Sequence, residues 1–263
     1  MTGIAGVAGV AGVAGVAGVA PRLVWQRATV RQLIQETPRV KSLVLSVPGW
    51  AGHRAGQHVD VRLTAENGYQ TERSYSVASA PVEPQVTITV ERLDDGEVSP
   101  YLTDEVRVGD EFELRGPIGG WFTWRPEEGG PLLLVAGGSG IAPLMAMIRQ
   151  RAAVQSPVPV RLLYSSRSDE EIIFREELDR RAAGDTDLDV VYTLTRSQPA
   201  GWQGYRRRID RAMLKEMAWA PAERPRVFVC GPTSLVESVA TLCVELGHAP
   251  ECVKTERFGP TSS

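Results

Sequence analysis

Hydrophobic and polar positions alternate along much of the chain between residues 21 and 127. Two clear runs are "GQHVDVRLT" (56–64) and "QVTITVERL" (85–93). A period of two places apolar side chains on one face of a β-strand and polar ones on the other. Because Gly and Pro turns separate several such runs, the pattern predicts an antiparallel β-barrel or sandwich over residues 21–127.

The pattern changes after "EEGGP" (127–131), where "PLLLVA" (131–136) is apolar without interruption. Such a run is typical of a strand buried on both faces. Predicted strands then alternate with predicted helices, with strands at 160–166, 187–195 and 226–230 and helices at 143–153, 172–183, 210–218 and 234–247. This order predicts a parallel sheet wrapped by helices. We therefore expect an antiparallel β-barrel domain followed by an α/β parallel-sheet domain at 128–263.

Residues 1–20 fit neither pattern. Most of this segment is a three-residue repeat of Gly, an aliphatic residue and Ala, without charge or proline. The lack of proline argues against a collagen helix, and the start is not basic as in a signal peptide. We expect a disordered low-complexity extension outside the fold, with a weak membrane or self-association segment as the alternative.

Composition narrows the class of protein. The chain has 263 residues, of which 43% are hydrophobic and 23% charged, with a net charge of −3. These values are ordinary for a soluble globular protein and give no basic field for nucleic acid. No later segment is long and apolar enough to span a membrane. We expect no nucleic-acid partner and no membrane partner.

The cysteines exclude some chemistry. Cys230, Cys243 and Cys252 are too few and too widely spaced for an iron–sulfur cluster or a zinc site. They also argue against a disulfide framework, which fits a reducing cytoplasm. We expect a cytoplasmic protein without a metal site.

The stretch "RSYS" (73–76) ends a predicted strand with unusual residues. Arg73 and Tyr75 should share one face about 7 Å apart, and Ser76 should point to the other. A little further on, in "DDGEVSPYLTDEV", Ser99 is a predicted N-cap. A helix start and a nearby arginine both attract anions, and a pyrophosphate would use both. A helix cap without any ligand is the alternative for Ser99.

A second phosphate-binding candidate is "LLLVAGGSGIAPLMAMIRQ" (132–150). Glycines let the backbone approach a phosphate closely, and the following helix offers free N–H groups. The spacing departs from G-x-G-x-x-G because Pro143 stands at the last glycine position. A tight turn with no ligand is the alternative.

Another strand, turn and helix follow in "RVFVCGPTSLVESV" (226–239). Cys230 ends the strand, at the edge where open α/β sheets bind ligands, although a small buried hydrophobe is the alternative. Ser234 and Glu237 have the spacing of a capping box.

Six motifs in order resemble the ferredoxin–NADP reductase family. They are "RSYS", "GEVS", "GPIGG", "GGSGIAP", "CGP" and "ERF". The resemblance covers residues 21 to about 260. It implies an FAD-binding barrel followed by a nicotinamide-nucleotide domain, in which hydride passes from the nucleotide to flavin N5.

The resemblance assigns roles in the barrel. Arg73 is similar to the partner of the FAD pyrophosphate, Tyr75 to the residue that packs against the isoalloxazine ring, and Ser76 to the hydroxyl near flavin N5. Val98 and Ser99 match the loop that binds the pyrophosphate through backbone amides and a hydroxyl. FMN in place of FAD stays open, because adenine contacts are poorly specified by motif.

The resemblance also assigns roles on the nucleotide side. The pyrophosphate loop corresponds to Gly138, Gly140 and Pro143, and the nicotinamide neighbours correspond to Cys230, Gly231 and Pro232. Glu256 and Phe258 match the terminal segment that approaches the flavin. Ser76 and Glu256 could help to relay a proton, and with Cys230 they are the expected catalytic residues. An apolar anchor is the alternative for Phe258.

The nucleotide is expected to be NADPH. The strand end "YSSRS" (164–168) carries Ser166 and Arg167 in place of the acid that NAD binders often have there. These residues could hold a 2′-phosphate, and Arg196 could assist. A solvated arginine in an Arg-rich protein is the alternative.

The predicted function is that of an NADPH-dependent FAD reductase. Because the cysteines cannot supply a cluster, electrons should pass to a separate acceptor protein: a ferredoxin, a flavodoxin, an oxygenase or a molybdenum enzyme. One alternative is a free-flavin or ferric reductase. The other is a flavin- or nucleotide-binding regulatory subunit without catalysis.

Overall fold

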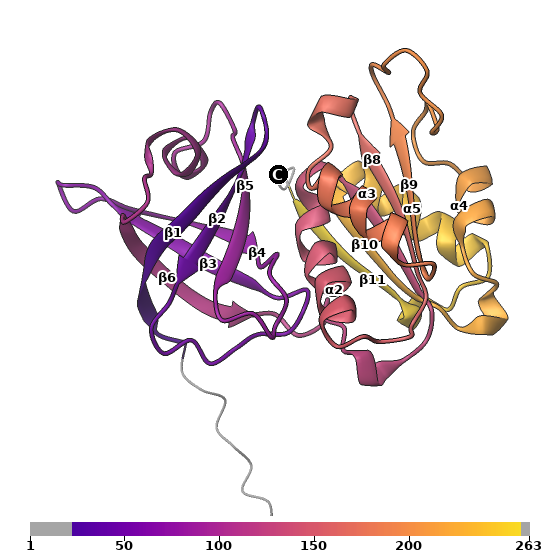
Figure 1. Ribbon diagram of the computed structural model, residues 1–263, viewed down its shortest axis with the longest axis horizontal. Helices are drawn as coiled ribbons and strands as arrows, with labels where there is room; N and C mark the ends of the chain where they lie inside the picture. Colours follow the sequence, from indigo (N-terminus) through magenta and orange to yellow (C-terminus); the bar gives the residue numbers. More distant parts are fainter. Residues whose placement is uncertain (1–22, 259–263) are drawn as a thin grey trace, which may run out of the picture.

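The computed structural model describes residues 23–258 and forms two lobes that lie side by side (Figure 1). The expected extension at residues 1–20 lies outside this range. No helix among the described residues is long and apolar enough to cross a membrane.

The first lobe is a six-stranded antiparallel sheet. Its strands are β1 (Trp25–Thr37), β2 (Val40–Ser46), β3 (His58–Thr64), β4 (Gln70–Ser76), β5 (Val86–Glu91) and β6 (Glu111–Ile118), in the order β4-β3-β6-β1-β2-β5. Its two edges approach each other just after β4, where Val77 bridges to Ile88 and the Ala78 N–H donates to the Thr87 carbonyl over 2.7 Å. The sheet therefore curls into a barrel, which confirms the predicted antiparallel domain.

The alternation predicts the interior of this barrel. Val59, Val61, Ile88 and Val90 all belong to one buried cluster. The short helix α1 (Val98–Pro100) and the π-helical turn η1 (Tyr101–Glu105) follow β5 and add apolar side chains to the same cluster.

The second lobe is a five-stranded parallel sheet. Its strands are β7 (Leu132–Gly137), β8 (Val160–Ser166), β9 (Leu188–Leu194), β10 (Arg226–Pro232) and β11 (Val253–Phe258), in the order β11-β10-β7-β8-β9. Short 3₁₀ turns occur at η2 (Pro126–Glu128), η3 (Gly138–Gly140), η4 (Asp169–Glu171), η5 (Pro221–Glu223) and η6 (Pro250–Cys252). Strand and helix alternate here as predicted, although the strand β11 was not expected.

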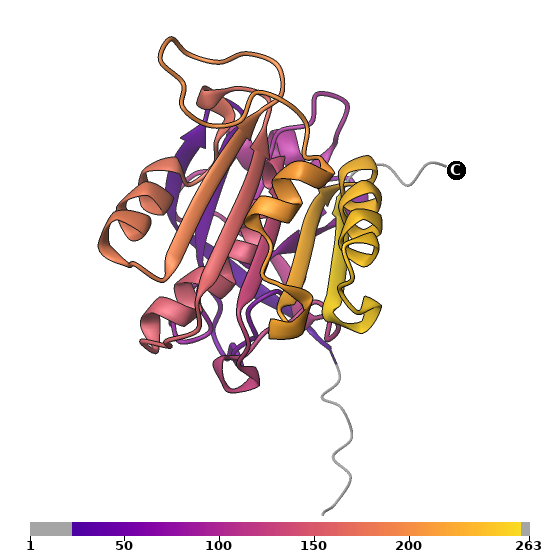
Figure 2. The same ribbon diagram turned by 90° about the vertical axis from the view of Figure 1, so that its right-hand side faces the viewer.

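Helices cover both faces of this sheet. α2 (Ile141–Ala153) and α3 (Arg175–Gly184) pack on the face nearer the barrel. α4 (Arg211–Met217) and α5 (Thr233–Glu245) cover the face turned away from it (Figure 2). This arrangement confirms the predicted α/β fold.

Two local predictions in this domain are wrong. The helix predicted at 172–183 is α3, and it begins at Arg175. Ile172 and Ile173 are buried before the helix, and Phe174 has a positive φ of 59° that interrupts helical geometry. The capping box of Ser234 with Glu237 is absent, since α5 starts directly after a proline without a side-chain cap. Glu237 instead accepts hydrogen bonds from Arg257.

The two lobes share one hydrophobic core. Val40, Ala78 and Trp124 of the first 127 residues belong to the same buried cluster as side chains from α2 and β7. The polar face of β5 lies near this junction, and its residues Thr87 and Thr89 are only 8% and 5% exposed. The face that the sequence marks as polar is therefore largely withdrawn from solvent.

Arg149 of α2 links the lobes by polar contacts. Its guanidinium donates to the Ala78 carbonyl over 2.9 Å and to both carboxylate oxygens of Glu177 over 3.1 and 2.5 Å. It also lies 4.9 Å from the ring centre of Phe174. The segment that follows β4 is thereby tied to both α2 and α3.

We predict that Arg149→Met lowers the free energy of unfolding by about 2–3 kcal/mol, because the Ala78 carbonyl and Glu177 lose a largely buried donor. Urea unfolding measures this loss. Arg27→Met is the control, since the Arg27–Glu111 pair is exposed and should be worth less than about 0.5 kcal/mol. Equal losses in the two variants would contradict the prediction.

Candidate functional site

The end of β4 reaches the junction between the lobes. Tyr75 pairs with Val59 and packs on the barrel core, whereas Ser76 pairs with His58 and points to the other face. Arg73 lies on the same side as Tyr75 but is exposed, and the only hydrogen bond of its side chain within residues 23–258 is to the adjacent Glu72 carbonyl. The expected alternation of these side chains is confirmed.

Seven buried side-chain nitrogen and oxygen atoms within residues 23–258 lack a hydrogen-bond partner, and two of them come from opposite lobes at the junction. These two are the Ser76 hydroxyl oxygen and Oε2 of Glu256. Ser76 is 4% exposed, so water does not compensate freely. Because buried polar atoms are nearly always hydrogen-bonded, this pair fits a ligand that carries polar ring atoms, as a flavin does.

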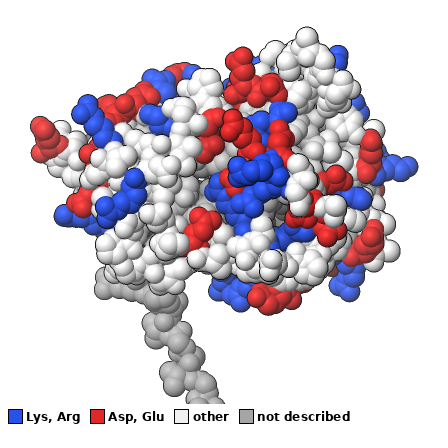
Figure 3. Space-filling model, in the orientation of Figure 1, with Lys and Arg blue, Asp and Glu red and all other residues white. Residues whose placement is uncertain are grey.

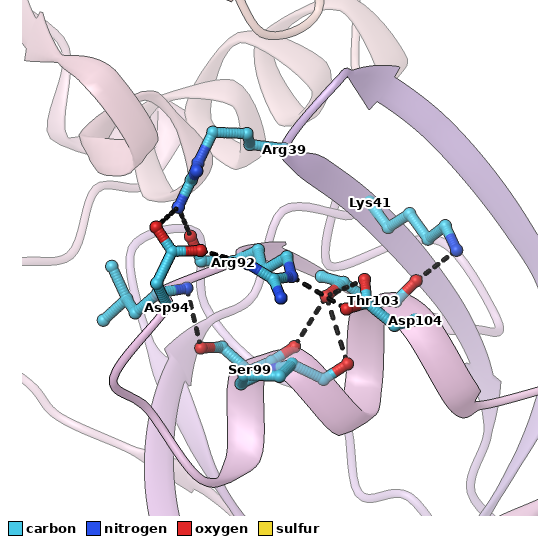
Figure 4. Close-up of polar contacts among 9 residues, drawn as sticks. Arg39, Lys41, Arg92, Asp94, Ser99, Thr103 and Asp104 are labelled. Carbon is cyan, nitrogen blue, oxygen red and sulfur yellow. Dashed lines mark hydrogen bonds and ion pairs between the residues drawn. The ribbon is translucent and has the colours of Figure 1, made fainter.

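The loop after β5 is held by its own side chains and by Arg39 from the turn between β1 and β2 (Figure 4). Arg39 donates to Asp94 over 3.0 Å, and Arg92 donates to Asp104 over 2.7 Å. The Thr103 hydroxyl donates to the carbonyl of Ser99 over 2.9 Å. The residues between β5 and η1 therefore form a fixed loop.

The prediction that Ser99 is an N-cap is wrong. Glu97 occupies that position without a side-chain cap, and the Ser99 hydroxyl accepts the Leu93 N–H over 3.0 Å. The loop folds back on itself and uses the hydroxyl internally. The Val98 side chain is buried in the barrel core. The groups that this turn can offer to a phosphate are therefore the backbone N–H groups of its first residues.

Two glycine turns pack together at the carboxyl ends of β7 and β10. A Cβ on Gly140 would lie 2.2 Å from the Cys230 carbonyl oxygen, so no other residue fits there. Likewise, a Cβ on Gly231 would lie 3.0 Å from the backbone nitrogen and oxygen of Gly137. The structure thus brings together the residues of both predicted nucleotide motifs, Gly138, Gly140, Pro143, Cys230, Gly231 and Pro232.

Tyr164 supports the first of these turns. Its hydroxyl donates to the Gly138 carbonyl over 3.0 Å and accepts the Ile173 N–H over 3.2 Å. Burial raises the pKa of Tyr164, so it stays a neutral donor. Sequence reasoning missed this residue, and the only signal was an aromatic ring within an otherwise small and aliphatic strand end.

The strands β10 and β11 align the expected nicotinamide neighbours. Cys230 pairs with Glu256, and Pro232 pairs with Phe258, which is partly buried against the shared core. Burial raises the pKa of the Cys230 thiol well above its ordinary value. Cys230 is therefore a neutral buried group, in line with the alternative that it is a small buried hydrophobe, and it is not an activated nucleophile.

Glu256 faces the barrel across the junction. Its Oε1 lies 3.9 Å from Nδ1 of His58. Burial raises the pKa of Glu256 to about 7 and lowers the pKa of His58. Near neutral pH, His58 is therefore largely uncharged, whereas Glu256 is divided between its protonated and ionised forms. His58 lies on the outer face of its strand, and that face is part of the junction.

The expected 2′-phosphate residues lie at the ends of β8 and β9. The Arg196 N–H donates to the Arg167 carbonyl over 2.9 Å, so the two arginines are neighbours. Arg167 is exposed and lies 3.9 Å from Glu171, while the adjacent Ser166 is buried. The structure brings these three residues to the same sheet edge as the glycine turns.

Other features of residues 23–258 lie apart from this site. No group of three His, Cys, Asp or Glu side chains in this part of the chain is arranged to hold a metal ion. A cavity of about 550 Å³ lies beside β9, where Arg175, Tyr192 and Trp202 line it. None of the expected site residues contributes to that cavity.

Comparison with known proteins matches both lobes. Residues 28–123 match the oxidoreductase FAD-binding domain, and residues 134–241 match the oxidoreductase NAD-binding domain. Ferredoxin–NADP reductase B of Sorangium cellulosum is 34% identical over 209 residues, covering 78% of this chain and 84% of that protein.

A longer relative is the glycine betaine monooxygenase reductase subunit of Chromohalobacter salexigens. It is 32% identical over 235 residues, covering 88% of this chain. The chain spans only 63% of the length of that relative. NADH-cytochrome b5 reductase 1 of Kluyveromyces lactis is 30% identical over 196 residues, with 73% of this chain and 69% of that protein covered.

Solved structures show the same fold. The FAD/NAD-binding domain of nitric oxide dioxygenase from Vibrio cholerae superposes with a TM-score of 0.79 at 25% identity, covering 89% of this chain and 99% of that one. A ferredoxin NADP⁺ reductase from Neisseria gonorrhoeae gives 0.76 at 23% identity, with 89% and 98% covered. On these matches, the chain belongs to the ferredoxin–NADP reductase family of FAD- and NAD(P)-binding oxidoreductases.

Proposed function

We propose that this chain is an NADPH-dependent FAD reductase that passes electrons to a separate acceptor protein. The observation that carries the proposal is the convergence of Ser76 and Glu256, each with an unpartnered buried oxygen, beside two glycine turns. When bound, FAD would supply an acceptor for hydride that can release electrons singly or in pairs. The protein would supply alignment, charge and exclusion of water.

The barrel residues fit the flavin as the family resemblance implies. Arg73 is exposed and forms no ion pair within residues 23–258, so its guanidinium is available to a pyrophosphate. Burial raises the pKa of Tyr75, which keeps the phenol neutral for packing against a ring. The turn that starts at Val98 and Ser99 would contribute backbone N–H groups.

The junction residues suit the exchange of hydride and protons. Ser76 and Glu256 face the junction from opposite domains, and the carboxyl of Glu256 can gain or lose a proton near neutral pH. Phe258 at the end of β11 would cover the flavin until the nicotinamide takes its place. Cys230 would shape the nicotinamide pocket as a neutral thiol.

The charged groups at the sheet edge favour NADPH. Arg167 directly follows Ser166, and its carbonyl accepts the Arg196 N–H, so both arginines project from this strand end. A 2′-phosphate is the part of NADPH that NADH lacks, and it suits guanidinium groups. The related proteins carry names that refer to either NADP or NADH. The preference therefore rests on these side chains of the chain itself.

A protein acceptor is supported by the relatives, some of which are named as reductase subunits of a monooxygenase. An oxygenase component, ferredoxin, flavodoxin or molybdenum enzyme would fill this role. Acidic and basic side chains are interspersed on the face shown in Figure 3, so the charge on this face does not select among them. The free thiols of Cys230, Cys243 and Cys252 support a cytoplasmic location.

The purified protein should be yellow, release FAD on denaturation, and bleach when NADPH is added without oxygen. Mass spectrometry of the released flavin distinguishes FAD from FMN. Reduction rates with ferredoxin, free FMN and ferric citrate should rank the protein acceptor first. A colourless protein that cannot be reconstituted with FAD would refute catalysis and support the regulatory-subunit alternative.

We predict that kcat/KM for NADPH exceeds that for NADH and that Arg167→Ala narrows the ratio. Loss of a charged hydrogen bond to the 2′-phosphate should cost about 1.5–3 kcal/mol, which is roughly a ten- to hundredfold loss with NADPH alone. Arg180→Ala is the control, because Arg180 is exposed on α3 and forms no ion pair among the described residues. A wild-type ratio at or below one would refute NADPH preference.

Glu256→Gln should remove a pH dependence centred near neutrality. The folded-state pKa of about 7 lies above the ordinary value of 4.5, so the folded state holds an extra proton between these values. As pH rises through this window, the wild type should therefore lose stability relative to the variant, by up to about 2–3 kcal/mol.

Two measurements check this expectation. Urea unfolding of the flavin-free proteins at about pH 5 and about pH 8 gives the stability difference. Stopped-flow reduction of the FAD-loaded proteins gives the rate, which should change near pH 7 only in the wild type. Parallel stability curves for the two proteins would show that burial does not perturb this carboxyl.

A further inference from the structure

Ser139 is the one polar side chain of the turn η3, and a residue of the barrel binds it. The Ser139 hydroxyl donates to Oε2 of Glu91 over 2.8 Å. Glu91 is the last residue of β5 and pairs with Val40, whose side chain belongs to the core shared by both lobes. The Glu91 carboxylate is therefore held at the junction, directly against the glycine turn of the nucleotide domain.

This carboxylate has no compensating cation. None of the ion pairs formed within residues 23–258 includes Glu91. By contrast, Glu177, another acidic residue near this junction, pairs with both Arg149 and Arg181. Glu91 also adds to the effect of burial in raising the pKa of Tyr164, whose hydroxyl binds the same turn. Its negative field reaches the backbone that would receive a phosphate.

The turn itself favours an anion. Gly138 has a φ of 54° and open space where a Cβ would be, and α2 begins immediately after the turn. Helix N–H groups and the helix dipole attract a pyrophosphate there. A dinucleotide at this position would meet repulsion from Glu91 and would compete with it for the Ser139 hydroxyl.

We propose that Glu91 is a barrel residue that sets nucleotide affinity, by weakening the binding of pyrophosphate-bearing dinucleotides and speeding their release. This role rests on the proposed function, since it requires a nucleotide at η3. It acts on NADPH and NADH alike, because both carry the pyrophosphate, and is thus separate from the choice made by Arg167. Release of the oxidised nucleotide clears the junction for the next turnover.

The Glu91→Gln variant distinguishes an effect of the carboxylate charge from an effect of the hydrogen bond with Ser139. A glutamine can still accept the Ser139 hydrogen bond, so a purely structural contact would leave affinity unchanged. Glu111→Gln makes the same change in net charge on an exposed barrel pair with Arg27 and is the matched control. Equal FAD content in all three proteins verifies that the variants fold.

The measurement is a spectroscopic titration of each FAD-loaded protein with NADP⁺ and with NAD⁺. Glu91→Gln should lower Kd for both by about five- to tenfold at about 50 mM salt, and less at about 500 mM, where charges are screened. Stopped-flow displacement should show slower release. Glu111→Gln should leave Kd within about twofold of the wild type.

The outcomes separate this inference from the proposed function. If all three proteins bind NADP⁺ and Glu91→Gln matches Glu111→Gln, Glu91 has no such role, although the reductase assignment stands. A gain in affinity that does not change with salt would also overturn the electrostatic argument. If no protein binds either nucleotide, the proposed function fails and the inference fails with it.

Discussion

Burial of the barrel against α2 fixes the position of every other part of the site. The barrel residues that would meet the flavin end β4, whereas the residues of the other domain that would meet the nicotinamide or cover the flavin end β7, β10 and β11. Hydride transfer requires its two reacting atoms to be within roughly 3–3.5 Å, so small changes in domain orientation would matter. A shared core supplies the rigidity that a flexible linker between two separate domains would lack.

Polar contacts around that core give the junction its orientation. Arg149 holds the segment after β4, Lys254 donates to the Thr123 carbonyl over 3.0 Å, and Ser139 donates to Glu91. Hydrophobic burial is non-directional, whereas these bonds require particular atoms to meet. Arg149 holds the segment that follows the end of β4, and Ser139 lies in the turn η3, so the contacts that dock the domains adjoin the proposed ligand sites.

Sequence patterns predict each domain better than the junction between them. Period-two alternation identifies the barrel strands, and glycine spacing identifies the turns at Gly140 and Gly231, where the backbone leaves no room for Cβ. Alternation cannot show whether a polar face meets water or another domain, which is why Thr89 and His58 were not recognised as junction residues. Ser99 shows a related difficulty: a hydroxyl has the same local pattern whether it caps a helix or binds a loop amide.

The junction also explains why a carboxyl can be tuned without a charged partner. The pKa of Glu256 is raised by desolvation, and the barrel contributes to this burial through His58. By linkage, ionisation of Glu256 must then oppose docking to the same extent that docking opposes ionisation. A proton held at this position therefore favours the closed arrangement of the domains, and loss of the proton favours solvent entry. Glu256, the proposed proton relay, thus also couples the protonation state of the site to the exclusion of water from it.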